Sequence, residues 1–236
     1  MQDQSEQHIG QGGFDHVETW VFDLDNTLYP AHCNLFDQVD KRMGAYISTL
    51  LDVDLVEAKR IQKGFFYEYG TTLRGLMDVH KIEPHDFLTF VHDIDVSVID
   101  PAGSLSEALT RLEGRKLVFT NGSHGHAENV LGRLGIRHHF DGVFDIADAE
   151  FVPKPEREAY DKFIAHAGFD TTRAAMFEDI ARNLEVPHAM GMTTVLVCSP
   201  DNESAEFIQK SGGAGDDADH VHHVIDDLAV FLHGIV

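Results

Sequence analysis

Short apolar runs alternate with longer amphipathic stretches along most of this chain. The first run, residues 19–24, is apolar until it ends in a pair of aspartates, which predicts a buried strand. The predicted strands are residues 19–24, 116–120, 143–147, 174–178, 193–197 and 222–225. The predicted helices after residue 100 are 104–113, 126–134, 155–167, 181–190 and 227–232. Strands joined by helices of this length predict an α/β fold with a parallel sheet and right-handed crossovers.

A long stretch of helical periodicity interrupts this alternation after the first strand. Its apolar residues recur at intervals of three and four, and no strand pattern is present. We therefore expect an all-helical insertion in an α/β core. The expected units are a flexible tail at 1–16, a core at 17–31 and 100–236, and a helical cap at 32–99.

The charge of the chain restricts its partners. The 236 residues carry a formal net charge of -22, which disfavours binding to nucleic acid or to an anionic membrane surface. An acidic protein that handles an anionic substrate needs local positive charge, so a metal ion and a few lysines are expected at such a site.

The cysteines and histidines add little chemistry. Cys33 and Cys198 are far apart and form no CxxC pattern, which favours a reducing compartment without a disulfide or zinc site. A leader segment and a run of membrane length are both missing from the sequence, so we expect a cytoplasmic protein. The sixteen histidines, especially His220 and His222, could suggest a transition-metal site, but solvated surface histidines are the simpler interpretation. Residues 201–219 predict an exposed acidic loop.

The most informative residues are Asp23 and Asp25, which follow the first strand. Residues two apart in a strand point the same way, and the carboxyl end of a parallel sheet is where ligands bind. Two adjacent carboxylates repel each other unless a cation or a shared proton offsets the charge. The pair alone is compatible with a metal site, an acid–base pair or both.

Other polar groups stand where later strands end or helices begin. Thr120-Asn121-Gly122 and Glu178-Asp179 each follow a predicted strand, and Lys154 precedes a helix. Because parallel strands end at one edge, these groups are expected to converge on Asp23. The carboxylates suit Mg²⁺, while Thr120, the following backbone N–H groups and Lys154 suit a phosphoryl group. Each motif alone is also typical of a turn or a helix cap. Their joint order favours a site.

The four segments resemble the four motifs of the haloacid dehalogenase superfamily: Asp23-x-Asp25-x-Thr27, a strand ending in Thr120, then Lys154, then Glu178-Asp179. The resemblance covers nearly the whole chain after residue 17. It implies a Rossmann-like core with a type 1 helical cap and magnesium-dependent phosphoryl transfer through an aspartyl-phosphate.

The resemblance also implies a role for each residue. Asp23 is the nucleophile, and Asp25 protonates the leaving oxygen and then deprotonates water. Asp23, the backbone carbonyl of Asp25 and Asp179 hold Mg²⁺, with Glu178 in or near that site. Dehalogenases of the superfamily lack the second acid, because a halide needs no proton. The presence of Asp25 favours a phosphate monoester as substrate.

Residues 23–30, 67–76 and 91–95 resemble the pyrimidine 5′-nucleotidase branch. On that resemblance a nucleoside monophosphate is the expected partner, with Asn26, Asn121, Gly122, Tyr69 and Arg74 as substrate-binding residues. The aromatic residues at 65–69 also fit the core of the cap. A phosphatase for phosphoglycolate or a sugar phosphate stays open, as does a phosphate- or metal-binding protein without turnover, although pure binding does not need an acid at Asp25.

Overall fold

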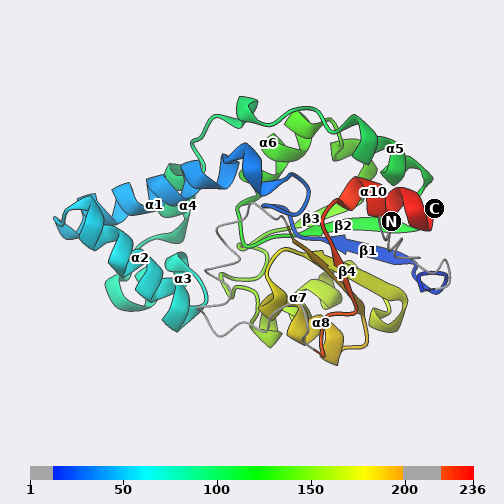
Figure 1. Cartoon of the computed structure of the whole chain (residues 1–236). Coiled ribbons are helices and arrows are strands. Elements are labelled where there is room, and N and C mark those ends of the chain that lie inside the picture. The colour runs from blue at the N-terminus through cyan, green and yellow to red at the C-terminus, as the bar shows by residue number, and fades with distance from the viewer. Residues whose placement is uncertain (1–12, 199–218) are drawn as a thin grey trace, which may run out of the picture.

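The computed structural model describes residues 13–198 and 219–236. At its centre a six-stranded sheet has the order β3-β2-β1-β4-β5-β6, and all neighbouring strands are parallel (Figure 1). The strands are β1 (Thr19–Phe22), β2 (Arg115–Phe119), β3 (Gly142–Phe144), β4 (Ala174–Glu178), β5 (Thr193–Val197) and β6 (His223–Ile225). The prediction of a parallel α/β sheet is confirmed. Strands are added outward from β1 on one side and from β4 on the other, so the strand order reverses between β1 and β4. Open α/β sheets bind ligands at the carboxyl ends of the strands at such a point.

Helices cover both faces of the sheet. Trp20 and Phe22 of β1 belong to one hydrophobic core and Val21 to the other, as expected for a strand buried on both faces. Helices α5, α6 and α10 lie on one side, and α7 and α8 lie on the other (Figure 1). Their bounds are α5 (Gly103–Arg111), α6 (His124–Leu134), α7 (Arg157–Ala167), α8 (Glu185–Ala189) and α10 (Leu228–Ile235).

Two predicted elements are each interrupted by a single residue. The third strand ends at Phe144, because Asp145 accepts hydrogen bonds from the N–H groups of Ala147 and Asp148 and forms a turn. The helix predicted over 181–190 is a 3₁₀ turn, η5 (Ala181–Leu184), followed by the short α8. Pro187 prevents one continuous helix, since its ring would meet the carbonyl of residue 183 four positions earlier.

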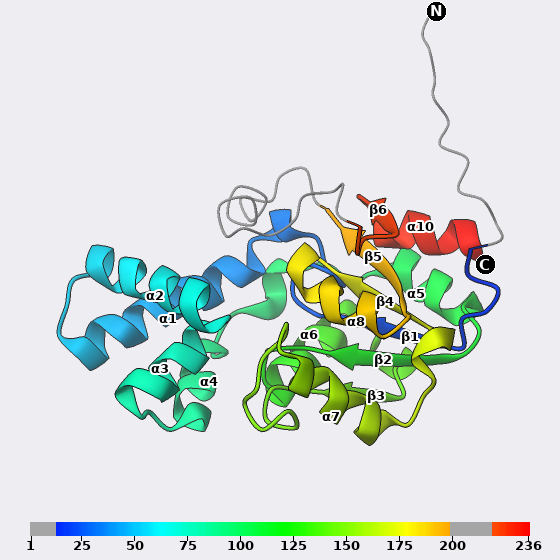
Figure 2. The same cartoon turned by 90° about the horizontal axis from the view of Figure 1, so that it is seen from below.

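Four helices form the helical insertion between β1 and α5 (Figures 1 and 2). They are α1 (Leu35–Leu51), α2 (Leu55–Tyr69), α3 (Thr72–His80) and α4 (Pro84–Val91). Their buried apolar faces form a separate hydrophobic core, which Ile146 from the sheet domain joins. Short 3₁₀ turns connect other elements: η1 (Ala31–Cys33), η2 (Val96–Val98), η3 (Arg137–His139) and η4 (Thr171–Arg173). The domain boundaries at residues 31 and 100 stay a prediction.

The segment before β1 is attached to the sheet domain where the structure describes it. Phe14 is buried and packs against Trp20 and Phe231, with ring centroids 5.8 and 5.5 Å away. The expectation of a loose tail therefore does not hold at Phe14. The rest of that prediction and nearly all of the predicted acidic loop lie outside the described residues. Within the described ranges, every helix is too short or too polar to cross a bilayer.

Candidate active site

Asp23 directly follows β1, at the carboxyl end of the strand. Its N–H donates to the carbonyl of Phe177 on β4 at 2.9 Å, so the backbone is held by the neighbouring strand as the β1 ladder ends. Asn26, with φ of 60°, lies in the left-handed region, where asparagine is tolerated better than most residues. Asp23 is 7% exposed. The hydrogen bond to β4 thus fixes the backbone position of Asp23, the first predicted site residue.

Lys154 joins two of the other predicted groups. Its ammonium donates to Asp23 Oδ1 and Glu178 Oε1, each at 2.6 Å, and to the carbonyl of Phe119 at 2.9 Å. The side chain is 1% exposed, so these contacts lie in a region that excludes water. Burial lowers the pKa of Lys154, but the charges of Asp23 and Glu178 outweigh that effect and the net shift is upward. Lys154 is therefore a fixed positive charge.

The turn after β2 holds Lys154 in place. The side-chain amide of Asn121 donates to the carbonyl of Lys154 at 3.2 Å, and its oxygen accepts from the N–H of Lys154 at 2.9 Å. Thr120 Oγ1 accepts from the N–H of Gly122 at 2.9 Å. Both polar groups of the Asn121 side chain are thus hydrogen-bonded to the backbone of Lys154. Substrate contact by Asn121 and Gly122 stays a prediction.

Three buried carboxylates could hold a metal ion. One oxygen each from Asp23, Glu178 and Asp179 lies within 4.8 Å of the others. Glu178 is already held, because its oxygens accept from Lys154, the Asn183 amide and the N–H of Ile180. Asp179 receives no side-chain hydrogen bond from the described residues. Hard oxygen donors of this kind suit Mg²⁺, and one lysine does not balance three carboxylates, so these residues fit the ion.

Burial and the neighbouring negative charges raise the pKa values of Asp23 and Asp179. Burial raises the pKa of Asp23 to about 7; Lys154 opposes the shift, and the charges of Glu178 and Asp25 add to it. Burial, followed by the charges of Glu178 and Asp23, raises the pKa of Asp179. Without a bound cation, the folded protein therefore disfavours the state in which Asp23, Glu178 and Asp179 are all ionised.

Asp25 has partners that the sequence analysis missed. Its Oδ1 accepts from the hydroxyl of Tyr29 at 2.5 Å and lies 2.8 Å from Nε2 of His126. Burial raises the pKa of Asp25, but the charge and hydrogen bond of His126 and the hydrogen bond of Tyr29 lower it overall. His126 is 1% exposed, so the interpretation of the histidines as surface residues is wrong here.

The signal for His126 in the sequence is its place in the first turn of the helix after Thr120-Asn121-Gly122. His220 and His222, by contrast, make structural contacts: His220 Nε2 lies 2.9 Å from the carbonyl of Ala181, and His222 Nδ1 accepts from the N–H of Thr194. Neither belongs to the group of possible metal ligands found in the described residues.

A family model described as haloacid dehalogenase-like hydrolase matches residues 17–191, well over half of the chain. The chain belongs to this family. The resemblance drawn from the four motifs is confirmed, and all the strand-end groups described above lie inside the matched range.

Relatives of this haloacid dehalogenase-like hydrolase agree on the fold. Phosphate metabolism protein 8 of Saccharomyces cerevisiae is 28% identical over 197 residues, which are 76% of this chain and 61% of the yeast protein. The chain thus spans less than two thirds of that relative. L-2-haloacid dehalogenase from Xanthobacter autotrophicus has a TM-score of 0.57 at 16% identity, covering 92% of this chain and 97% of its own. A HAD phosphatase from Thermococcus onnurineus has a TM-score of 0.57 at 16% identity, covering 89% and 93%. The fold therefore does not distinguish the two reactions.

The helical insertion touches the site of this hydrolase through the loop between α2 and α3. A Cβ added at Gly70 would lie 3.9 Å from both Pro153 and Pro155, on either side of Lys154. Tyr69 next to it packs edge-on against Phe65, while Arg74 pairs with Asp78 one turn along α3 at 2.9 Å. Substrate contact by Tyr69, Arg74 and Asn26 stays a prediction.

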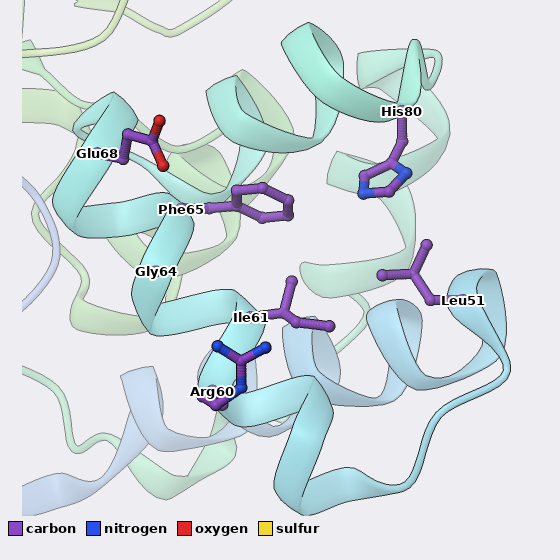
Figure 3. Close-up of a pocket in the computed structure, with 7 residues that line it drawn as sticks. All are labelled: Leu51, Arg60, Ile61, Gly64, Phe65, Glu68 and His80. Atoms are coloured by element: carbon purple, nitrogen blue, oxygen red, sulfur yellow. The ribbon is translucent and has the colours of Figure 1, made fainter.

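The helical insertion also contains a hollow (Figure 3). It has a volume of about 330 Å³, and none of the predicted site residues lines it. The lining residues are Leu51, Arg60, Ile61, Gly64, Phe65, Glu68 and His80. Phe65 is partly buried in the core of the insertion, which agrees with its interpretation as a packing group, whereas Tyr67 is 41% exposed.

Proposed function

We propose that this protein is a magnesium-dependent phosphatase that hydrolyses phosphate monoesters through a phosphorylated Asp23. The observation that carries the proposal is the second carboxylate, Asp25, held beside Asp23 by Tyr29 and His126. A halide leaves without a proton, whereas an alkoxide leaving from phosphorus gains from a general acid. The acid at Asp25 therefore favours the phosphatase over the dehalogenase.

In this proposal the carboxylate of Asp23 attacks phosphorus, and the bond to the ester oxygen breaks. Because the charge of the bound phosphate favours the protonated form of the neighbouring carboxyl, Asp25 takes up a proton from solvent as the substrate binds. It gives this proton to the ester oxygen and later takes a proton from the water that hydrolyses the aspartyl-phosphate. Lys154 orients Asp23, to which it donates at 2.6 Å, and adds positive charge next to the phosphoryl group. Thr120 and the N–H groups of the following turn bind the phosphoryl oxygens.

The same proposal assigns the metal ligands. Asp23, Asp179 and the backbone carbonyl of Asp25 would hold Mg²⁺, with Glu178 alongside. When bound, the ion supplies positive charge that screens the approach of the anionic substrate to an acidic site. The buried group of Asp23, Glu178 and Asp179 supports this assignment.

Hydrolysis of p-nitrophenyl phosphate with and without MgCl₂ tests the proposal. We expect activity that requires Mg²⁺ and disappears in Asp23→Asn, while the circular dichroism spectrum stays that of the wild type. Asp161→Asn, at an exposed carboxylate paired with Arg157 on α7, is the matched control and should keep full activity. An active Asp23→Asn enzyme would contradict the nucleophile assignment.

We further propose that the substrate is a pyrimidine nucleoside monophosphate and that the protein acts in the cytoplasm. The contact of the α2–α3 loop with the segment around Lys154 supports a role for Tyr69 and Arg74 next to the phosphoryl site. A panel of nucleotides, sugar phosphates and phosphoglycolate tests this. Uridine and cytidine monophosphates should have the highest kcat/KM; equal rates for all esters would refute the nucleotide assignment.

Arg74 can be tested separately, because it pairs with Asp78. Arg74→Gln and Asp78→Asn both remove this exposed ion pair, which contributes about 0.3–0.5 kcal/mol to stability. If Arg74 contacts the nucleotide, only Arg74→Gln raises KM for uridine monophosphate. An equal change of KM in both variants would mean that the pair acts through the helix alone.

A further inference from the structure

The two oxygens of Asp25 have different surroundings. Oδ1 receives both contacts, from Tyr29 at 2.5 Å and from His126 at 2.8 Å. Oδ2 receives no hydrogen bond from the described residues. It lies toward the turn after β2, because a Cβ added at Gly122 would be 3.7 Å from Oδ2 and 3.2 Å from Thr120 Oγ1. The free oxygen of Asp25 therefore lies on the side of the proposed phosphoryl site.

The ring of His126 is itself fixed on several sides. The N–H of His126 donates to Ser123 Oγ at 3.3 Å, which caps the start of α6. The ring of His92 stacks on it, with centroids 4.4 Å apart and planes at 9°, and His92 Nδ1 lies 2.8 Å from the same Ser123 hydroxyl. His92 directly follows α4, so the last helix of the insertion supports the ring that faces Asp25.

Nδ1 of His126 has no hydrogen-bond partner in the described part of the chain, although the atom is buried. Nε2 is therefore the nitrogen through which the ring makes its polar contact, as an N–H donor to Asp25. A buried histidine with one polar contact, aimed at the proposed proton carrier, is placed to orient that carboxylate.

We propose that His126 is a positioning residue that, together with Tyr29, holds Oδ1 of Asp25 so that Oδ2 alone exchanges protons with the substrate. This inference rests on the proposed phosphatase function. The proton on Oδ2 passes to the ester oxygen as the P–O bond breaks and the bond from Asp23 to phosphorus forms. Oδ2 then accepts a proton from water in the second step, and His126 keeps its own proton throughout.

The leaving group provides a readout for this role. Nitrophenolate is stable as an anion and needs little protonation, whereas the alkoxide of glycerol phosphate depends on the general acid. A defect in the orientation of Asp25 therefore lowers kcat/KM for glycerol phosphate more than for p-nitrophenyl phosphate. A general disturbance of the turn or the metal site would lower both values by the same factor.

The test compares His126→Phe, which keeps a flat ring against His92 but has no donor, with His126→Gln, whose amide nitrogen can replace Nε2. We expect His126→Phe to lose about 100-fold in kcat/KM for glycerol phosphate and about 10-fold or less for p-nitrophenyl phosphate. His126→Gln should recover most of the larger loss. His124→Phe, two residues earlier at an exposed position of α6, is the matched control and should resemble the wild type.

Equal losses on the two substrates, wild-type kinetics in His126→Phe, or no recovery in His126→Gln would overturn the inference. If His126→Phe does not fold, Tyr29→Phe removes the other donor to Oδ1 and must show the same dependence on the leaving group. A wild-type protein that hydrolyses neither ester would instead refute the proposed phosphatase function, so the two failures are distinguishable.

Discussion

The sheet edge and the helical insertion differ in how firmly their polar groups are held. At the sheet edge, Asp23, Lys154 and Glu178 are at most 7% exposed and are joined by hydrogen bonds of 2.6 Å. In the insertion, Arg74 is partly exposed and pairs with a neighbour on its own helix. The groups proposed to carry the chemistry are thus held by the parallel sheet, whereas the proposed selectivity depends on side chains with local contacts.

Removal of Lys154 tests the first half of this comparison and has the largest expected effect. Lys154→Met leaves the carboxylates of Asp23 and Glu178 buried without their shared cation. Breaking a buried ion pair in this way costs about 3–5 kcal/mol of the free energy of unfolding. We expect that loss in urea unfolding, together with the loss of p-nitrophenyl phosphate hydrolysis.

The matched control is Lys162→Met on α7. Lys162 pairs with Glu150 and Glu158 at 2.7 and 2.9 Å, but both carboxylates are largely exposed. Exposed pairs contribute about 0–1 kcal/mol, so this variant should unfold close to the wild type and keep its activity. Similar losses of stability in the two variants would mean that burial does not distinguish the sheet edge from the surface.

The sheet edge was predictable because its geometry follows from the backbone. A parallel sheet brings the ends of its strands to one edge, so the polar residues that follow three apolar runs in the sequence could be assigned to one site. Lys154 follows no strand, yet the hydrogen bonds of Asn121 bring it there. The contribution of that turn was not visible in the sequence, where Asn121 was expected to face the substrate.

His126 was missed for a different reason. The distance of 101 positions between Asp25 and His126 is closed only when α6 packs on the sheet, and a histidine within a helix is usually a surface residue. Similarly, the break at Pro187 and the turn at Asp145 depend on single residues rather than on periodicity. Local patterns therefore predicted the elements, while the contact between His126 and Asp25 required tertiary structure.

The excess negative charge at the sheet edge leads to a second prediction, with a smaller expected change in stability. The pKa of Asp179 is raised in the folded protein, so the folded state binds more protons than the unfolded chain as pH rises above the ordinary value of a carboxyl group. The contribution of Asp179 to the free energy of unfolding of the metal-free protein therefore decreases as pH increases. Asp179→Asn should relieve that loss.

In EDTA at about pH 7.5 we expect Asp179→Asn to be more stable than the wild type by about 1–2 kcal/mol, and the difference to shrink towards about pH 5. Addition of MgCl₂ should raise the Tm of the wild type but not that of the variant. Asp78→Asn, at an exposed carboxylate on α3, is the control. A variant less stable than the wild type in EDTA would contradict the excess of negative charge at the sheet edge.

The smallest expected change in stability tests how tightly the helical insertion is packed. A Cβ added at Gly75 on α3 would lie 2.4 Å from the Phe65 ring, whereas one at Gly64 on α2 meets nothing within 4 Å. Gly75→Ala combines overpacking of about 1–3 kcal/mol with a helix gain of about 0.5–1 kcal/mol, so it should destabilise the protein by about 1 kcal/mol.

Gly64→Ala has only the helix gain and should stabilise the protein by about 0.5–1 kcal/mol in the same urea measurement. Opposite signs for the two variants would show that the insertion has a tightly packed interior at the contact of α2 with α3, directly behind the loop that carries Gly70. Equal stabilisation by both variants would mean that the Phe65 ring moves aside at little cost in free energy. The loop would then lack rigid support, and a fixed nucleotide contact by Tyr69 or Arg74 would lose its structural basis.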